Sequence, residues 1–418
     1  MDERKDYGGK KCAGGKCAER IVLEENVLKE NGWNKNGWKE ALHYFIKIAV
    51  KTGLRVFHVF PVKENRITLL NDMSYTYGDS MKYLYLYMKK KRKNRYETVY
   101  PLKALPRTKP DGVILVRRNT VRYYYYLMTS RVIITNAGGV SFLPKRKGQM
   151  IINTWHGGGP YKKTGTNVFH GFFYNRETAL NAGQIDYMLS ACEYNMVYEF
   201  LSMGIPKEKC VPSGIPRNDI FFRNHQRISE KVRRHFGIGK DKKIVLYAPT
   251  FRLDADGYTG KKVMAHNTFD YAGTVSALHD RFGGDWVSGL RLHPKIGRKA
   301  AVNEDVFNMT DYPDIQELLC AADVLITDYS SVMWDFSLTG RPVFLYLADL
   351  EECKKKPGFY MPPEEWPYPI AQTAEELKDS IAEYDAETYR IRLHEHYQRS
   401  GSYEKGNACE TVLDLIEN

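Results

Sequence analysis

Residues 324–335 read Val324-Leu325-Ile326-Thr327-Asp328-Tyr329-Ser330-Ser331-Val332-Met333-Trp334-Asp335. The first four predict a short strand, and the apolar residues from Val332 onward predict a helix. An uninterrupted apolar strand is typical of a parallel sheet that is buried on both faces. The turn places Ser330 and Ser331 at the start of the helix, where hydroxyl and backbone N–H groups can bind an anion. Alternatively, one serine only caps the helix.

The same alternation of strand and helix extends over most of the chain. A first set of predicted strands covers Arg66–Leu70, Glu97–Pro101, Gly112–Val116, Arg131–Thr135, Met150–Thr154, Tyr187–Ser190 and Lys209–Pro212. A second set covers Lys243–Ala248, Trp286–Leu292, Val306–Met309, Val324–Thr327 and Val343–Tyr346. Predicted helices include Ser80–Lys91, Thr120–Thr129, Ile228–Phe236, Tyr271–Arg281, Ile315–Ala321 and Val332–Leu338. Two such sets predict an α/β protein with two doubly wound, Rossmann-like domains that face each other across a cleft.

The composition limits the class of protein and its partners. The chain has 418 residues, 43% of them hydrophobic and 27% charged, which is typical of globular proteins and excludes wholesale disorder. Its formal net charge of +12 favours an anionic partner: nucleic acid, anionic lipid or a phosphorylated substrate. The seven cysteines are scattered without a CxxC pair, so we expect free thiols in a reducing compartment and no metal site. We expect neither a secretory signal nor a bilayer-spanning helix.

We divide the chain into four parts. Residues 1–65 form an N-terminal tail with an amphipathic basic helix, 66–226 an N-terminal Rossmann-like domain, 227–385 a C-terminal Rossmann-like domain and 386–418 a C-terminal helical segment. From Lys39 to Phe60, a basic residue or histidine recurs every four positions among mostly apolar residues. This pattern predicts a helix with a narrow basic stripe and a wide apolar face, as an interfacial helix on anionic lipid requires. The alternative is a helix that packs on its own protein.

Ligands of doubly wound sheets bind beyond the carboxyl ends of the strands, so the residues that follow each strand are the candidates for function. His156 follows a strand and precedes three glycines, and a histidine there is suited to act as a general base. Arg217 follows the last strand of the first set and is a candidate anion contact. In the second set, Thr250 and Arg252 follow one strand and His293 follows the next. Together with Ser330 and Ser331, these side chains predict a cleft for a phosphorylated ligand, with a diphosphate as the first choice.

These segments, in this order and spacing, resemble the CDP-glycerol glycerophosphotransferase family of teichoic-acid primases and polymerases. The resemblance covers roughly Arg66 to Tyr346 and includes Trp155-His156-Gly157, Gly214-Ile215-Pro216-Arg217-Asn218-Asp219, Ala248-Pro249-Thr250-Phe251-Arg252, Arg291-Leu292-His293-Pro294 and residues 327–335. It implies a GT-B-like fold with an N-terminal membrane-associating segment, peripheral attachment to the cytoplasmic face of the cell membrane, and no metal or other cofactor. It also implies transfer of a polyol phosphate from a CDP-polyol to a lipid-linked acceptor, with release of CMP.

The resemblance also implies roles for single residues. His156 would deprotonate the acceptor hydroxyl, and we count His293 with it as catalytic, close to the donor diphosphate. Arg217, Thr250, Arg252, Ser330 and Ser331 would bind the donor. Many members have Trp-His-Gly-Thr-Pro where this chain has an extra small residue after His156, so the acceptor is left open.

Several alternatives remain at this stage. A GT-B glycosyltransferase that uses a nucleotide sugar would share the fold and the phosphate contacts. A nucleic-acid-binding protein would use the basic run Lys89–Lys93, but this run fits the end of a helix better, and we expect no nucleic-acid partner. Glycerol against ribitol, primase against polymerase, and the oligomeric state are not decided by the sequence.

Overall fold

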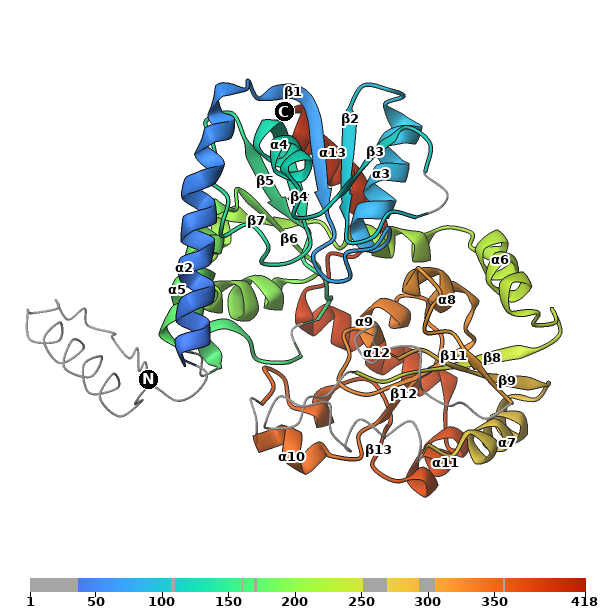
Figure 1. The fold of residues 1–418 in the computed structure, drawn as a ribbon. Helices are drawn as coiled ribbons and strands as arrows, with labels where there is room; N and C mark the ends of the chain where they lie inside the picture. Colours follow the sequence, from blue (N-terminus) through green and yellow to red (C-terminus); the bar gives the residue numbers. More distant parts are fainter. Residues whose placement is uncertain are drawn as a thin grey trace, which may run out of the picture.

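Two parallel sheets, one above the other in Figure 1, organise the chain. The structure is a computed structural model, and it describes residues 37–106, 110–159, 161–168, 171–250, 269–292, 305–355 and 358–418. Arg252 and His293 lie outside these residues. None of the helices in the described ranges is long and apolar enough to cross a bilayer.

The first sheet has seven strands in the order β3-β2-β1-β4-β5-β6-β7, and all neighbours are parallel. The strands are β1 (Lys63–Leu70), β2 (Glu97–Leu102), β3 (Val113–Arg117), β4 (Ser130–Thr135), β5 (Met150–Asn153), β6 (Tyr187–Ser190) and β7 (Cys210–Pro212). The order reverses between β1 and β4, which makes the carboxyl ends of these two strands the switch point where such sheets bind ligands.

The second sheet repeats this topology with six parallel strands in the order β10-β9-β8-β11-β12-β13. The strands are β8 (Lys243–Ala248), β9 (Trp286–Leu290), β10 (Val306–Asn308), β11 (Val324–Thr327), β12 (Val343–Tyr346) and β13 (Ile370–Ala371). Its switch point lies between β8 and β11, the strands that end just before Thr250 and Asp328.

Helices cover both sheets. Those before the second sheet are α2 (Gly37–Gly53), α3 (Asp79–Lys91), α4 (Val121–Thr129), α5 (Phe172–Gln184) and α6 (Gln226–Phe236). Those that follow are α7 (Tyr271–Phe282), α8 (Ile315–Ala321), α9 (Val332–Ser337), α10 (Leu350–Lys355), α11 (Ala374–Ala382), α12 (Ala386–Ser400) and α13 (Ala408–Glu417). Short turns are the 3₁₀ segments η1 (Leu54–Val59), η2 (Gly165–Asn167), η4 (Lys207–Lys209), η5 (Pro216–Phe222) and η7 (Pro363–Glu365), and the π-helical η3 (Asn195–Phe200).

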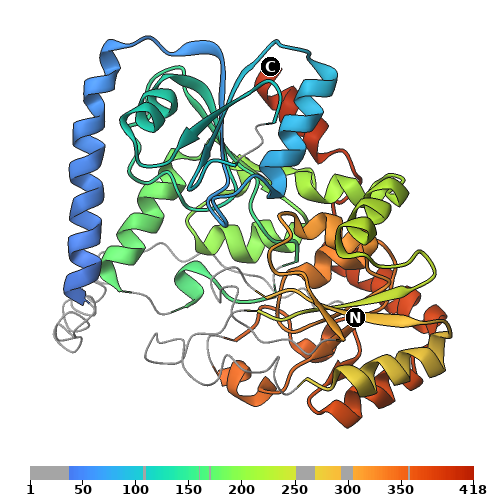
Figure 2. The same ribbon diagram turned by 45° about the vertical axis from the view of Figure 1, so that its right-hand side comes forward.

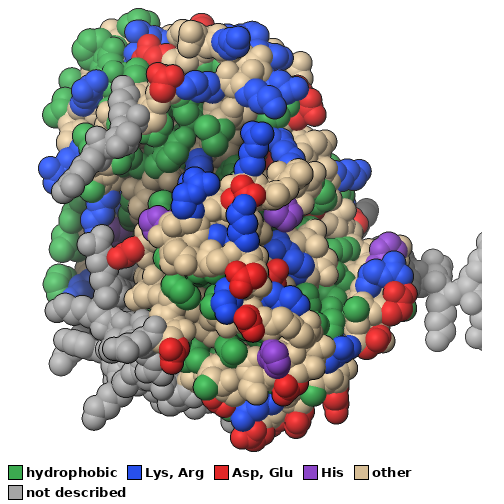
Figure 3. Space-filling view, turned by 90° about the vertical axis from the view of Figure 1, so that its right-hand side faces the viewer, with side chains coloured by type: hydrophobic (Ala, Val, Ile, Leu, Met, Phe, Trp, Pro, Cys, Tyr) green, Lys and Arg blue, Asp and Glu red, His purple; other side chains and the backbone are tan. Residues whose placement is uncertain are grey.

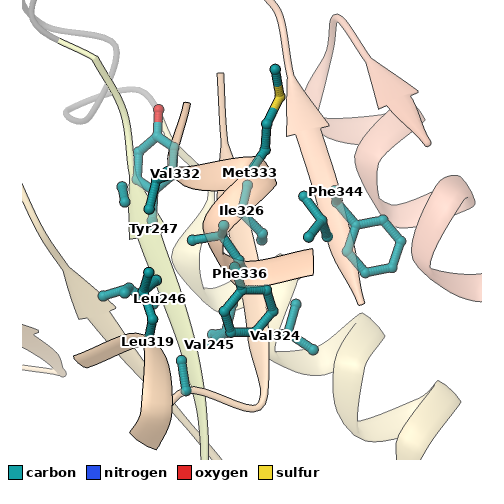
Figure 4. Close-up of a cluster of buried hydrophobic side chains, with 14 of the residues drawn as sticks. Val245, Leu246, Tyr247, Leu319, Val324, Ile326, Val332, Met333, Phe336 and Phe344 are labelled. Atoms are coloured by element: carbon teal, nitrogen blue, oxygen red, sulfur yellow. The ribbon is translucent and has the colours of Figure 1, made fainter. Parts of the chain in front are cut away.

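The core of the second domain explains why its sequence forms a two-sided sheet. Figure 4 shows apolar side chains from β8, β11 and β12 packed in one cluster with those of α8 and α9. Leu246, Ile326 and Phe344 on the strands, and Met333 and Phe336 on α9, are fully buried. Each such side chain contributes about 1.5–3 kcal/mol when it leaves water, so continuous apolar strands are required here.

The chain crosses between the two domains more than once. The loop after β5 runs into the second domain, and α13, at the end of the chain, returns to the first sheet, where Val412 and Leu413 pack with Met81 and Leu84 of α3. Both ribbon views show α13 beside the first sheet (Figures 1 and 2). Lys82 of α3 also forms ion pairs with Asp314 and with Glu317 of α8. In Figure 3, which shows the side of the molecule with α3 and α6, acidic and basic side chains lie next to one another.

The expected strands and helices are present, with ends that differ by at most three residues, the largest difference being the start of β1 at Lys63 in place of Arg66. The predicted helix from Lys39 to Phe60 is α-helical only to Gly53 and continues as the tighter η1, in which Leu54 is buried in the first domain. Helices α5 and α10 to α13 and strand β13 were not predicted individually. The division at residues 65, 226 and 385 stays a prediction.

Candidate active site

His156 lies three residues beyond β5, beside the ends of β1 and β4. Its Nδ1 is 2.9 Å from the carbonyl oxygen of Asn136, the residue that follows β4. A carbonyl oxygen only accepts, so the neutral ring carries its hydrogen on Nδ1 and its lone pair on Nε2. Asn136 is in turn fixed by β1, since its side chain donates to Asn71 Oδ1 (3.1 Å) and accepts from the backbone N–H of Asp72 (2.9 Å). The segments that follow β1, β4 and β5 therefore fix the ring of His156 with its hydrogen on Nδ1, which is the state that a general base acting through Nε2 requires.

The surroundings of His156 keep it neutral. Burial lowers the pKa of His156 to about 4; the hydrogen bond with the Asn136 carbonyl opposes this shift, while the positive charge of Arg217 adds to it. At neutral pH the imidazole is therefore unprotonated. The indole of Trp155 packs against it, with 4.1 Å between the ring centroids.

The three glycines after His156 allow the chain to pack closely on the second domain. A Cβ atom on Gly158 would lie 1.9 Å from Cδ1 of Trp334 in α9, so a side chain does not fit there. A Cβ atom on Gly157 would lie 3.1 Å from the side chain of Ser331. The glycine loop of the first domain thus brings His156 into the neighbourhood of the serine turn of the second.

The residues that follow the glycines pack against the second domain. Tyr161 is buried there, and its hydroxyl is 3.1 Å from Nε2 of His396. Lys163 N–H donates to the carbonyl of Gly358 (3.2 Å), which fixes the loop in an antiparallel pairing. The Lys162 ammonium lies 5.6 Å from the ring centroid of Tyr329, the residue before the two serines. A cation is thereby placed beside the serine turn.

At the switch point of the second sheet, Thr250 and Asp328 join the ends of β8 and β11. The backbone N–H of Thr250 lies 3.0 Å from both carboxylate oxygens of Asp328, and its hydroxyl donates to one of them at 2.7 Å. Ser330 Oγ accepts from the backbone N–H of Val332 (3.4 Å), the first residue of α9, whereas Ser331 is the N-cap residue and its side chain makes no capping hydrogen bond. The predicted donor contacts of Thr250, Ser330 and Ser331 stay predictions.

Arg217 is buried between two carboxylates from different domains. It donates to Asp79 at the start of α3 (3.0 Å) and to Asp335 of α9 (2.7 Å). Asp335 also accepts from Asn218 (3.1 Å) and Gln316 (2.9 Å). Burial raises the pKa of Asp335, and the charge of Arg217 opposes this shift. Arg217 therefore links the two domains, and a role in donor binding stays a prediction.

Sequence reasoning overlooked some of these groups. Asn136 directly follows a predicted strand, so the rule that singled out His156 could have found it. Asp328 lies inside the quoted motif but was passed over for the serines beside it. Arg291 belongs to the quoted segment Arg291-Leu292-His293-Pro294, and the structure gives it a structural role, because its guanidinium donates to the carbonyls of Met309 (2.8 Å) and Thr310 (2.6 Å).

A profile of the family described as CDP-glycerol:poly(glycerophosphate) glycerophosphotransferase matches residues 53–418. The chain belongs to this family. The match covers the whole first sheet, the second sheet and α13, and it includes each predicted site residue. The family resemblance stated from the sequence is thus confirmed.

Curated members of the family support this assignment. The chain is 30% identical over 361 residues to the teichoic acid poly(glycerol phosphate) polymerase of Staphylococcus epidermidis, a match that spans 81% of this chain but 48% of the polymerase. It is 31% identical over 306 residues to the teichoic acid ribitol-phosphate primase of Bacillus spizizenii (70% of this chain, 76% of the primase). A teichoic acid glycerol-phosphate transferase of Staphylococcus aureus is 26% identical over 400 residues (90% and 99%). The chain therefore spans about half the length of the S. epidermidis polymerase.

Solved structures of the wall teichoic acid polymerase TagF have the same fold. The TM-score is 0.75 at 27% sequence identity, over 92% of this chain and 98% of the TagF chain. A TagF variant soaked with CDPG matches equally well, with 26% identity. The predicted GT-B-like arrangement of two Rossmann-like domains is confirmed by this likeness.

Proposed function

We propose that this chain transfers a polyol phosphate, with glycerol phosphate as the first choice, from a CDP-polyol to a hydroxyl of a lipid-linked acceptor. CMP is released, and the product belongs to a teichoic-acid-like or capsular polymer. The observation that carries the proposal is the state of His156: a neutral imidazole with its hydrogen on Nδ1 and an unprotonated Nε2, close to the serine turn of the other domain. Family membership supports the same reaction.

In the proposed reaction, Nε2 of His156 takes the proton of the acceptor hydroxyl. The oxygen of this hydroxyl attacks the phosphorus of the CDP-polyol that bears the polyol. The bond from this phosphorus to the CMP oxygen breaks, and the electron pair leaves with CMP. Negative charge builds up on the phosphoryl oxygens in the transition state, and cations and N–H or O–H donors stabilise it. We assign this work to Arg217, Thr250, Arg252, His293, Ser330 and Ser331.

The identity of the released nucleotide tests the reaction. Incubation with a lipid-linked acceptor and CDP-glycerol, CDP-ribitol or UDP-glucose, each separately, is expected to give CMP from a CDP-polyol, also in the presence of EDTA. Chromatography of the nucleotides distinguishes the outcomes. Release of UDP or CDP would overturn the proposal in favour of a glycosyltransferase, and the faster of the two CDP-polyols identifies the donor.

The pH dependence tests the role of His156 separately. Because burial lowers the pKa of His156 to about 4, the base form persists far into the acid range. Protonation of Nε2 removes the lone pair, so kcat/KM of the free enzyme is expected to fall only as the pH drops through about 4, and not near 6.5. Initial rates of CMP release, measured over the pH range in which the fold persists, check this. An acid limb near 6.5 would contradict a buried base.

We further propose that the chain binds the cytoplasmic face of the membrane through α2. Both ribbon views show this helix along the outer edge of the first domain (Figures 1 and 2). One side of α2 packs on α5, where Lys47 forms an ion pair with Glu177 and Tyr44 contacts Phe173. The other side leaves large apolar side chains exposed: Trp38, Leu42, Phe45 and Ile46, continued in η1 and beyond by Val56, Val59 and Phe60. Exposed large apolar side chains gathered along one helix in this way mark an interaction surface.

The structure changes the expected role of the basic stripe. Lys47 faces Glu177, and Lys51 is half-buried; its pKa is lowered by burial and by the nearby charge of Arg55. These two lysines therefore face the protein more than the solvent. Lys39 and Arg55 are exposed and remain candidates for contacts with anionic lipid headgroups.

A further inference from the structure

Asn153, the last residue of β5, has a side-chain amide that joins two loops. The residue is 1% exposed, and its Nδ2 donates to the carbonyl of Ala137 at 3.1 Å, in the loop that follows β4. Its Oδ1 accepts from the backbone N–H of Trp155 at 2.8 Å, in the loop that follows β5. Because a carbonyl only accepts and an N–H only donates, these two partners fix the orientation of the amide. Removal of this buried amide would break both hydrogen bonds, which is costly away from water.

The hydrogen bond of His156 joins the same two loops. Its Nδ1 is bonded to the carbonyl of Asn136, which directly precedes Ala137, and its backbone directly follows Trp155. The amide of Asn153 and the imidazole of His156 therefore connect the loops side by side, through neighbouring residues at each end. The distance between the Asn136 carbonyl and the backbone of His156 is thus set by Asn153 as well as by the imidazole.

The contacts on either side of Asn153 show that both of its hydrogen bonds are needed. Trp155 has a positive φ of 56°, which is unfavourable for a bulky residue and persists only where surrounding contacts impose it. The hydroxyl of Thr135 is 3.2 Å from the carbonyl of Ala137, but it is closer, at 2.8 Å, to the carboxylate of Asp72. A hydroxyl has one hydrogen to donate, and a carboxylate is the stronger acceptor, so the Ala137 carbonyl depends on Asn153.

We propose that Asn153 is a positioning residue for the transfer reaction: its amide holds the Asn136 carbonyl at the distance from His156 that keeps the imidazole hydrogen on Nδ1. The inference rests on the proposed role of His156 as the base. Without the amide, the loops after β4 and β5 move apart, and the bond from Nδ1 to the Asn136 carbonyl weakens. The two neutral forms of the ring then become similar in energy, and only the form with hydrogen on Nδ1 takes a proton at Nε2.

The first test compares kcat with KM in Asn153→Leu, which keeps the size of the side chain and removes both hydrogen bonds. We expect kcat to fall by about 10- to 100-fold, because a small misplacement of a catalytic group has an effect of this size. The KM for CDP-glycerol should stay within about twofold, since no assigned donor contact involves this amide. A defect in KM with an unchanged kcat would overturn the proposal.

Asn153→Asp tests whether the hydrogen-bonding groups, and not the volume, are what matters. A protonated carboxyl has the shape of the amide, donates through its hydroxyl and accepts through its carbonyl, whereas the ionised form cannot donate. At about pH 5, where a buried carboxyl is protonated, this variant should recover most of the kcat that Asn153→Leu loses. Its kcat relative to the wild type should not rise as the pH increases. An Asn153→Asp variant as slow as Asn153→Leu at every pH would contradict the proposal.

Asn181→Leu is the matched control, because Asn181 of α5 binds the same loop at a different point. Its half-buried side chain accepts from the backbone N–H of Val140 at 3.2 Å, four residues after Asn136. This variant should lose thermal stability and keep kcat within about twofold of the wild type. Thermal denaturation is measured for every variant. If kcat falls equally in Asn181→Leu and Asn153→Leu, the effect is one of loop stability, and the positioning role is refuted.

A readout that does not depend on turnover keeps the inference testable if the chain releases no CMP. In ¹⁵N NMR of histidine-labelled protein, the signals of His156 are assigned by their loss in His156→Ala. The wild type and Asn181→Leu should show a single state with hydrogen on Nδ1, and Asn153→Leu should show a mixture of the two neutral forms. Failure of CMP release would then refute the proposed function only, whereas an unchanged His156 signal in Asn153→Leu would refute the positioning role.

Discussion

His156→Ala is expected to lower the turnover number for CMP release by about 10²–10⁴-fold, the usual contribution of a general base. Binding of CDP-glycerol should be almost unchanged, because the imidazole takes the acceptor proton and makes no assigned contact with the donor. The effect should therefore appear in kcat at saturating donor. Initial rates and isothermal titration calorimetry with CDP-glycerol measure the two quantities.

His279→Ala is the matched control for this variant. His279 of α7 also has its Nδ1 close to a backbone carbonyl, that of Gly284 at 2.8 Å, but it lies on the solvent-exposed side of the second domain. Loss of this imidazole should leave the turnover number unchanged. Near-normal turnover in His156→Ala would exclude His156 as the base. Weakened binding of CDP-glycerol in the same variant would show that His156 contacts the donor.

The local sequence pattern was sufficient to predict the two parallel sheets. Strands such as Ile244–Leu246 and Val324–Ile326 are apolar on both faces, and only a parallel sheet covered on both sides buries them completely. Because parallel strands of one sheet all end at one edge, residues distant in sequence meet there, as Thr250 and Asp328 do after β8 and β11. The approach of the glycine loop of the first domain to Ser331 of the second depends on how the domains pack, which the local pattern does not give.

Long-range partners could not be read from the sequence. Arg217 looks like a free cation next to a helix, but the fold brings Asp79 and Asp335 to it from elements far away in the chain. Glu199 lies among polar and aromatic residues and reads as a solvent-exposed acid, yet it is buried. The return of α13 to the first sheet cannot be predicted from a local pattern either. The apolar stripe of α13 predicts that this helix packs on the protein, but not on which part of it.

Membrane attachment should depend on the apolar edge of α2. Phe45→Glu combined with Ile46→Glu is expected to move the protein from the liposome pellet to the supernatant. Phe45 is 58% and Ile46 51% exposed, and the ring of Phe45 also contacts Phe173 of α5 at 5.8 Å between centroids, so thermal denaturation of the variant must show that the fold is kept. A large apolar side chain that enters lipid contributes up to about 1.5–3 kcal/mol, so the loss of two removes most of a weak interfacial binding energy. Sedimentation with vesicles that contain anionic lipid measures the bound fraction.

Lys39→Gln combined with Arg55→Gln is the companion variant, because it removes exposed charge and leaves the apolar edge in place. Each cation near an anionic surface is worth about 1 kcal/mol and is screened by salt, so this variant should bind more weakly and depend less on salt than the wild type. Insertion of apolar side chains is insensitive to screening, and high salt alone should therefore release little wild-type protein. If the double glutamate variant still sediments with liposomes while the charge variant does not, attachment is electrostatic. The exposed side chains of α2 would then have to be covered by something other than lipid.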